Sequence, residues 1–275
     1  YSKLKKDLSS FGELANPNLI KLGFWPGGDR DGNPFVTADV TKNVADELRM
    51  TLMKCYYKDI KELERQLTFR LVKDDLLSLK DKVYQSMFSS SLILSHTEIL
   101  THLSNIRKNI TTHYSDLYLD ELDKVIDKVN IFKSHFASID IRQDHSVHLN
   151  CINAIIKLNK WSTKRFEDMD WEEQLDLLNK DTKLNPEQFE DPLVIDTIKN
   201  ISQLNSIQLS NGVDGCHRYI ISNSVDIYSV LFVYKLFEWC GWKKEDIKFD
   251  IIPLFETMEG MQNAENTMEF LYSNS

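Results

Sequence analysis

The sequence predicts an α/β protein in which helices far outnumber strands. Several stretches place apolar residues at helical spacing, and four short apolar runs lie between long helical stretches. Each of the four runs is followed at once by polar residues. Buried runs joined through helices are typical of a parallel sheet, because crossovers between parallel strands need helices. The polar residues are then expected at the carboxyl edge of that sheet, where α/β proteins bind ligands.

The first expected strand covers residues 19–25 and leads into a loop, residues 27–33, that holds three of the nine glycines. The glycines alternate with charged residues in Gly-Gly-Asp-Arg-Asp-Gly-Asn, which includes Arg30, and indicate a tight, charged loop. A plain surface turn is one alternative. A calcium loop fails because Pro34 and Val40 stand where a glycine and a glutamate are required. A phosphate-binding P-loop fails because no Gly-Lys-Ser/Thr follows.

Three helices are predicted from apolar residues spaced three or four apart, at residues 44–55, 60–71 and 122–132. Their expected buried stripes are Val44, Leu48, Leu52 and Cys55; Ile60, Leu63, Leu67 and Leu71; and Leu122, Val125, Val129 and Phe132. Polar loops are expected near residues 168–191 and 210–215.

The second expected strand, residues 136–141, ends directly before Arg142. A guanidinium at that edge is suited to a phosphate or carboxylate, although an ion pair with Asp140 or Asp144 explains the residue equally well. His135, His145 and His148 lack the spacing of a zinc site and are interpreted either as residues that support the site from behind or as core residues. Cys151 lies in an apolar helical stretch, which favours packing over nucleophilic chemistry.

The third and fourth expected strands cover residues 219–221 and 249–255, and the fourth leads into Glu256. This carboxylate is a suitable oxygen ligand for Mg²⁺ or Mn²⁺. A glutamate that caps a helix or faces its dipole is the competing interpretation, and on the local sequence alone it is the stronger one.

Composition, charge and cysteine count argue against several classes of protein. The formal charge of −9, without a local basic patch, argues against a nucleic-acid partner. Apolar runs are too short for a membrane span, and no signal-peptide stretch is present at the start, so neither membrane nor secretion is indicated. Four scattered cysteines argue against a disulfide framework and favour a cytoplasmic setting.

Four motifs together resemble phosphoenolpyruvate carboxylase. Residues 23–34 read Gly-Phe-Trp-Pro-Gly-Gly-Asp-Arg-Asp-Gly-Asn-Pro, close to the family's G-x-W-x-G-G-D-R-D-G-N-P. Residues 139–143 resemble its L-D-I-R-Q, residues 218–222 its R-Y-V-I-S, and residues 253–257 its P-L-F-E-T. The four matches keep the family's order and cover nearly the whole chain.

The resemblance implies a partial (β/α)₈ TIM-type barrel with many additional helices, so that residues 1–275 form one incomplete catalytic domain. The implied reaction adds bicarbonate to phosphoenolpyruvate and yields oxaloacetate and phosphate, with Mg²⁺ or Mn²⁺. On the family's pattern Arg142 binds the substrate phosphate, Glu256 is one of two acidic metal ligands, and Trp25 and Leu254 wall the pocket for the methylene group. Arg142 and Arg30 are the implied catalytic residues, and Arg30 with its flanking aspartates also shapes the neighbouring active-site loop. The implied partners are the two substrates, the remainder of a longer chain and further copies in a homo-oligomer.

Parts of the family's catalytic set are absent. Its T-A-H-P-T motif is expected before residue 1, and its S-D-S-x-K-D and H-G-R-G-G motifs after residue 275. Where the family continues R-Q-E-S-x-R-H, this chain has Asp144, His145 and Val147. We therefore expect the chain by itself to be inactive. A helical scaffold domain and a phosphate-ligand sensor on the same fold are the competing functions.

Overall fold

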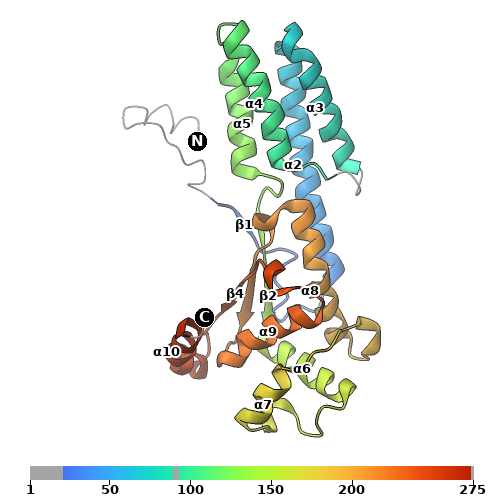
Figure 1. Cartoon of the computed structure of the whole chain (residues 1–275), viewed down its shortest axis with the longest axis vertical. Helices are drawn as coiled ribbons and strands as arrows, with labels where there is room; N and C mark the ends of the chain where they lie inside the picture. Colours follow the sequence, from blue (N-terminus) through green and yellow to red (C-terminus); the bar gives the residue numbers. More distant parts are fainter. Residues whose placement is uncertain (1–20, 89–92, 274–275) are drawn as a thin grey trace. The chain divides into compact units, whose positions relative to one another are not determined.

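The protein is a mostly helical α/β structure in the computed structural model, which describes residues 21–88 and 93–273 (Figure 1). The predicted class is therefore confirmed at this level. The described residues form two compact units. The first comprises residues 21–23, 45–88, 93–138 and 207–215, and the second residues 24–44, 139–206 and 216–273. Whether both belong to one catalytic domain stays a prediction.

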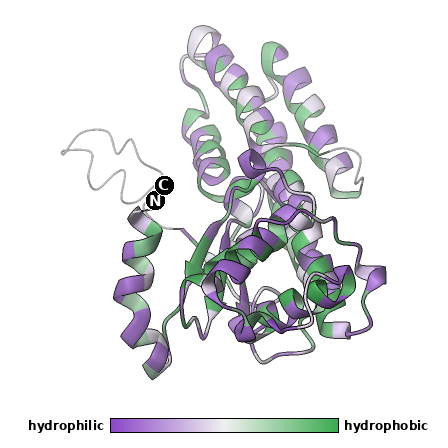
Figure 2. Ribbon diagram, turned by 60° about the horizontal axis from the view of Figure 1, so that its bottom comes forward, coloured by the Kyte–Doolittle hydropathy of each residue, from purple (hydrophilic) through white to green (hydrophobic). Residues whose placement is uncertain are grey.

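The first unit is a helical bundle. It contains helix α2 (Ala38–Gln66) from residue 45 onward, α3 (Arg70–Phe88), α4 (His96–His113) and α5 (Leu119–Phe132), which run side by side in Figure 1. Each helix contributes apolar side chains at helical spacing to one shared core. The largest buried members include Tyr56, Met53, Ile60, Leu76, Ile99 and Leu103. Hydrophilic residues occupy the outer faces in Figure 2.

The prediction for the first two helices was wrong in its boundary and in part of its stripe. Helix α2 continues to Gln66, and α3 begins at Arg70, so the expected helix over residues 60–71 crosses a turn. Leu67 is fully buried while Leu71 is half exposed, because the turn rotates Leu71 away from the core. In α2 the core takes Tyr56 and leaves Cys55 exposed. At this point of α2 the buried face is therefore shifted by one residue toward the C-terminus relative to the prediction.

The second unit contains the sheet. Its strands are β1 (Gly23–Phe24), β2 (Ser138–Asp144), β3 (Arg218–Ser222) and β4 (Asp250–Pro253), hydrogen-bonded in the order β1-β2-β3-β4. Strand β3 runs parallel to both β2 and β4, with Arg142 opposite Ile220 and Ile220 opposite Ile252. Of the expected first strand, residues 19–20 lie outside the described residues, and only two of the others are in strand conformation.

The two faces of the sheet differ in burial. Ile139, Ile141, Tyr219 and Ile221 alternate along β2 and β3 and are fully buried. On the other face, the register aligns half-buried residues, among them Arg142, Ile220 and Ile252. The strands therefore have one strongly apolar face, as expected where helices cover a sheet on one side.

Helices connect the parallel strands. Between β2 and β3 lie α6 (His145–Asn159), α7 (Trp171–Leu178) and α8 (Pro192–Asn211), together with three short 3₁₀ turns (Phe166–Asp168, Pro186–Gln188 and Val213–Gly215). Helix α9 (Ile227–Trp239) and the turn Lys244–Asp246 join β3 to β4, and α10 (Met258–Ser273) follows β4. Helix α9 packs against β4, α6 and α10.

The polar segment at residues 168–191 is not simply a loop, since it contains α7. Asp170 caps this helix: its side chain accepts from the Glu173 backbone N–H, and the Glu173 side chain accepts from the Asp170 backbone N–H. This reciprocal capping box stabilises a helix of only two turns. Among all described helices, none is long and apolar enough to span a bilayer.

Candidate functional site

The glycine-rich loop lies against the carboxyl end of β2. The Arg142 backbone N–H donates to the Gly28 carbonyl at 2.9 Å, and the Arg30 backbone N–H donates to the Arg142 carbonyl at 2.8 Å. These two bonds extend the sheet locally as a parallel bridge between Asp29 and Arg142. The loop is therefore fixed in register with the strand that carries the candidate phosphate-binding arginine.

Two adjacent glycines allow this close approach. Gly27 has φ +83°, and a Cβ added there would lie 2.6 Å from Cγ2 of Val44. A Cβ added to Gly28 would lie 2.1 Å from the Asp140 carbonyl oxygen, inside the backbone of β2. The Thr41 hydroxyl also donates to the Gly27 carbonyl at 2.7 Å. The contacts with β2 and with the start of α2 thus leave no room for a side chain at either of the two glycines that were predicted to make a tight loop.

Arg142 lies at the centre of a cluster of side chains at the carboxyl edge of the sheet. Its Nη2 donates to Oδ2 of Asp31 at 2.9 Å and to Oε1 of Glu256 at 3.4 Å. Its Cζ lies 5.8 Å from the ring centroid of Trp25, within cation–π range. The structure therefore brings Trp25, Arg142 and Glu256 together, although they are far apart in the chain.

The ion pairs considered for Arg142 from the sequence do not form. Asp140 instead accepts from Arg218 on the neighbouring strand, with Nη2 at 2.6 Å. Asp144 accepts from Ser146 and Asn223. Both acids that the sequence offered as ion-pair partners of Arg142 are therefore bonded to other residues. The carboxylates that do contact Arg142 come from the loop after β1 and the loop after β4.

Glu256 is also held by the loop after β3. Its Oε1 accepts from the backbone N–H of Asn223 at 3.1 Å. The Asn223 side chain donates through Nδ2 to Oδ2 of Asp144 at 2.6 Å. Asn223 has φ +52°, a conformation that asparagine tolerates better than most residues. This residue links the ends of β2, β3 and β4.

Asp144 begins helix α6. Its Oδ1 accepts from the Ser146 backbone N–H at 2.7 Å, which makes it the N-cap. Burial alone would raise the pKa of Asp144, but the hydrogen bonds from Ser146 and Asn223 outweigh it and the pKa is lowered. The shorter acid at this position thus fulfils a defined structural role.

Arg30 has a different environment from Arg142. Only 5% of the residue is exposed, and Nη2 forms an ion pair with Oδ2 of Asp196 on α8. Oδ1 of Asp196 in turn accepts from the Ala38 backbone N–H at the start of α2, at 2.9 Å. Asp196 therefore joins the glycine-rich loop to two helix segments of the same unit. No sequence signal identified Asp196, because an isolated aspartate within a helix has no recognisable motif.

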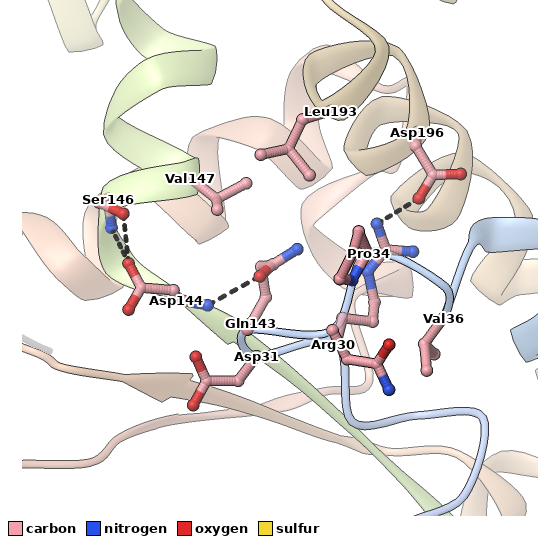
Figure 3. A pocket seen from close by; sticks show the side chains of 12 residues that line it. Arg30, Asp31, Pro34, Val36, Gln143, Asp144, Ser146, Val147, Leu193 and Asp196 are labelled. Carbon is pink, nitrogen blue, oxygen red and sulfur yellow. Dashed lines mark hydrogen bonds and ion pairs between the residues drawn. The ribbon is translucent and has the colours of Figure 1, made fainter.

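A pocket of about 380 Å³ opens beside this loop (Figure 3). Pro34, Val36, Val147 and Leu193 supply apolar walls, while Arg30, Gln143 and three aspartates supply polar ones. Trp25, Arg142, Leu254 and Glu256 are not among its lining residues. The pocket is therefore adjacent to the cluster around Arg142 and shares Asp31 with it.

Leu254 directly follows β4. Its backbone N–H donates to the Ile221 carbonyl at 2.9 Å, and its carbonyl accepts from the Ser224 N–H at 3.1 Å. Its side chain is half-buried. The backbone is thus anchored to the end of β3, at the same sheet edge as Arg142, but among the described contacts none joins the Leu254 side chain to Trp25.

Of the two histidines after β2, His148 is a core residue and His145 is half-buried. His148 is fully buried, and its Nε2 lies 2.9 Å from the Tyr219 hydroxyl. Burial lowers the pKa of His148 to about 3, so the ring is neutral at physiological pH. The ring of His145 stacks on Phe232. Cys151 is also fully buried, and burial raises the pKa of its thiol to about 12, which agrees with packing rather than nucleophilic chemistry.

The described residues supply an incomplete set of ligands for a divalent metal ion. Within residues 21–88 and 93–273, no three His, Cys, Asp or Glu side chains are grouped to hold a metal ion. The Oε1 atom of Glu256 already accepts from Arg142 and Asn223. The described residues therefore do not fit a metal site by themselves.

Comparisons with known sequences match the chain to one family over nearly its whole length. The family model described as phosphoenolpyruvate carboxylase matches residues 1–91 and 76–275. Curated relatives bearing that name include a protein of Trichormus variabilis, 25% identical over 99% of this chain, and one of Synechocystis, 27% identical over 96%. A Nitrosomonas eutropha relative is 24% identical over 99% of this chain. These alignments cover 32%, 31% and 35% of the respective relatives, so the chain spans about a third of their length.

Proposed function

The chain belongs to the phosphoenolpyruvate carboxylase family, and from this membership we propose that it is one segment of an enzyme that adds bicarbonate to phosphoenolpyruvate. The products are oxaloacetate and phosphate. The observation that supports this role best is the position of Arg142 at the carboxyl edge of the sheet, between Trp25 and Glu256. A helical scaffold leaves the convergence of these three residues unexplained. A phosphate-ligand sensor on the same fold would retain Arg142 and Glu256, and it differs from the enzyme in that the complete protein would form no oxaloacetate.

Arg142 is proposed to bind the phosphate of the substrate. A guanidinium offers five N–H donors in a planar fork that matches phosphate oxygens. Asp31 and Glu256 hold the group in place from two loops, and its side chain keeps 18% of its surface exposed. A phosphoryl group can therefore reach the guanidinium without unfolding either loop, and fixed positive charge at that point stabilises the charge that develops during transfer.

Trp25 and Leu254 are proposed to form the wall against the methylene group of phosphoenolpyruvate. Trp25 is 52% exposed beside Arg142, so its ring face is open to a ligand. Leu254 is anchored at the same sheet edge by bonds to Ile221 and Ser224. An apolar wall next to a phosphate-binding arginine suits a small anion that has one apolar end.

Arg30 is proposed to act as a positioning residue. Its guanidinium is buried against Asp196 and has no route to a substrate held by Arg142. Its backbone N–H, however, bonds the carbonyl of Arg142 itself. Arg30 therefore shapes the loop that carries Asp31, and Asp31 orients the Arg142 side chain.

The metal is proposed to be Mg²⁺ or Mn²⁺, with Glu256 as one carboxylate ligand. Such a cation would supply Lewis-acid stabilisation of the enolate oxygen. The remaining ligands are assigned to other segments of the longer protein, since the described donor set is incomplete.

The sheet is proposed to be half of a (β/α)₈ barrel. Its strand order follows the chain, the crossovers contain helices, and the face bearing Arg142 is the less buried one. Those features are expected of consecutive barrel strands, whose polar ends gather at the carboxyl edge. The remainder of the longer chain would supply the other strands. A cytoplasmic location and assembly into a homo-oligomer belong to the same proposal.

Replacement of Arg142 tests the function in the complete protein that contains this chain. Arg142→Gln should lower oxaloacetate formation, followed by coupling to malate dehydrogenase, by at least a hundredfold, as expected when a transition-state charge partner is lost. Arg142→Lys should recover only a small part, because an ammonium lacks the planar fork.

The matched control is Arg65→Gln, which removes the same charge from an exposed helical position in the other unit. It should leave turnover unchanged. Undiminished turnover of Arg142→Gln would rule out the assigned role, and a complete protein without any oxaloacetate formation would rule out the proposed activity.

A further inference from the structure

The loop after β3 contains a residue that bonds to the ends of both neighbouring strands. Asn223 donates from its backbone N–H to Oε1 of Glu256 at 3.1 Å and from its side-chain Nδ2 to Oδ2 of Asp144 at 2.6 Å. Glu256 lies in the loop after β4, while Asp144 is the last residue of β2 and lies two residues after Arg142. Asn223 therefore connects the loop that carries Glu256 to the strand that carries Arg142.

The backbone beside Asn223 is fixed by the first turns of α10. The Asn263 side chain on α10 donates to the Val225 carbonyl at 3.1 Å. A Cβ added to Gly260 would lie 2.3 Å from the Ser224 carbonyl oxygen, so α10 lies directly against the loop after β3. These contacts hold the loop from the side of β4, and the amide of Asn223 supplies a bond on the side of β2.

An asparagine at this position also has an ordinary structural explanation. Asn223 has φ +52°, and asparagine tolerates this region better than most residues, so a turn alone accounts for the residue type. That explanation does not account for the side-chain bond to β2. Oδ1 of Asp144 is engaged by Ser146 (Figure 3), and among the described contacts Asn223 is the donor to Oδ2.

Glu256 connects Asn223 to Arg142. Oε1 of Glu256 accepts from the Asn223 N–H and also from Nη2 of Arg142. The same Nη2 donates to Asp31 at 2.9 Å. Both carboxylates therefore hold one end of the guanidinium, and within the described residues Nη1 has no hydrogen-bond partner. A fixed Nη2 leaves Nη1 for an oxygen of an incoming phosphate.

We propose that Asn223 is a positioning residue for the binding of phosphoenolpyruvate. Its amide holds Asp144, and its N–H holds the Glu256 carboxylate against Arg142. This inference rests on the proposed function, in which Arg142 binds the substrate phosphate. Loss of the bond to Asp144 releases the loop after β3 and displaces Glu256, so that Asp31 alone orients the guanidinium. Substrate affinity then falls, although no group that touches the substrate has been removed.

Exchange of the two bonded side chains tests this role in the complete protein. Asn223→Asp keeps the size of the side chain and tolerates the positive φ, but it places a carboxylate opposite Asp144. It should raise the KM for phosphoenolpyruvate by about fivefold or more. Asn223→Asp/Asp144→Asn restores one amide and one carboxylate, and it should return the KM to within about twofold of wild type, since asparagine also serves as a helix N-cap.

The KM separates a positioning role from a folding defect. A partly unfolded variant contains less active enzyme, which lowers the apparent kcat but leaves the KM unchanged. The matched control is Asn153→Asp on α6, because Asn153 also donates from Nδ2 to a carboxylate, Oε2 of Glu167, at 2.9 Å. This substitution creates the same repulsion away from the cluster and should leave the KM unchanged.

Calorimetric titration of phosphoenolpyruvate, with Mg²⁺ but without bicarbonate, measures affinity independently of turnover. Weaker binding in Asn223→Asp that the exchanged pair restores supports the inference. Unchanged binding in Asn223→Asp, equal weakening by Asn153→Asp, or no recovery in the exchanged pair overturns it and leaves the role of Arg142 standing. A wild-type complete protein that neither binds nor carboxylates phosphoenolpyruvate rules out the proposed function, and the inference with it.

Discussion

Arg30 and Asp196 form one ion pair, although only Arg30 lies in a motif that could be recognised in the sequence. The Gly-Gly-Asp-Arg-Asp-Gly-Asn loop identified Arg30 in the sequence. Its partner became visible only in the fold, because the two residues are separated by 166 positions. Asn223 is similar: it belongs to the polar segment that follows the third expected strand, but its bonds to Glu256 and Asp144 depend on how three strands align.

Removing both partners of the Arg30–Asp196 pair should cost less stability than the sum of the two single removals. Arg30→Met should lower the free energy of unfolding by about 3 kcal/mol, because it leaves a partly buried carboxylate without its cation. In Arg30→Met/Asp196→Leu the loss should be smaller than the sum of the single losses. Urea unfolding of the two single variants and the double variant measures this coupling, and strictly additive losses would show that the pair contributes no interaction energy.

Buried neutral histidines should make stability fall at mildly acidic pH. Burial lowers the pKa of His148 to about 3 and that of His135 to about 4. An unfolded histidine has a pKa near 6.5, so between about pH 6.5 and 4 the unfolded state binds more protons and stability decreases as pH falls. Each histidine should contribute on the order of 2 kcal/mol of loss from pH 7 to pH 5. Burial raises the pKa of Asp226, which acts in the opposite direction at lower pH.

Urea unfolding midpoints at pH 7, 6 and 5 test this dependence. His148→Gln keeps a hydrogen-bonding side chain near the Tyr219 hydroxyl but does not titrate, so its pH slope should be shallower by about one proton. His113→Gln, at an exposed position, should retain the wild-type slope. Identical slopes for wild type and His148→Gln would contradict the prediction.

At the scale of the element, helix α4 depends on its first turn. The Ser95 hydroxyl accepts from the Glu98 backbone N–H at 3.2 Å, and the Glu98 carboxylate accepts from the Ser95 N–H at 3.0 Å. Ser95→Ala should therefore destabilise the helical bundle by about 1 kcal/mol. Hydrogen exchange should become faster in the first turn of α4.

A second substitution in the same helix is the control. Thr101 donates to the Thr97 carbonyl within α4 and makes no capping contact. Thr101→Ala should be neutral or slightly stabilising, because alanine has the higher helix propensity. Equal destabilisation by both substitutions would mean that the capping box adds nothing.

Element types followed from the sequence more reliably than element boundaries. The strand candidates at residues 136–141, 219–221 and 249–255 coincide with β2, β3 and β4, because a short apolar run followed by a polar cluster is a local signal. The turn between α2 and α3 has no proline or glycine within residues 66–70, so the continuous apolar spacing concealed it. Helix α7 was missed because two helical turns rich in acidic residues look like a loop until the capping box is recognised.

At the scale of the whole molecule, three of the residues that the motifs predicted for the site lie close together. Trp25, Arg142 and Glu256 come together because Arg142 lies near the carboxyl end of β2, while Trp25 and Glu256 follow β1 and β4 of the same sheet. The roles of these residues in binding substrate or metal stay predictions. A single sequence gave no means to predict the division into two compact units, because no linker composition separates them.

The chain by itself should not form oxaloacetate. If Arg142 and Glu256 have their proposed roles, one arginine for the phosphate and one carboxylate for the metal are too few to stabilise charge at both reacting centres. A coupled malate dehydrogenase assay of the purified 275-residue chain should show no activity above background, whereas the complete protein should be active. Measurable turnover by the chain alone would contradict this prediction.

The indole of Trp25 is half exposed and its ring centroid lies 5.8 Å from Cζ of Arg142, so its fluorescence should respond to whatever binds the guanidinium. A ligand that covers the ring replaces water around it and should shift its emission to shorter wavelength. Of the four other tryptophans, Trp239 is only 1% exposed, so it is already shielded and should not respond. The difference spectrum between wild type and Trp25→Phe would then report occupancy of Arg142 without any attached dye, and it would do so even in variants that no longer turn over.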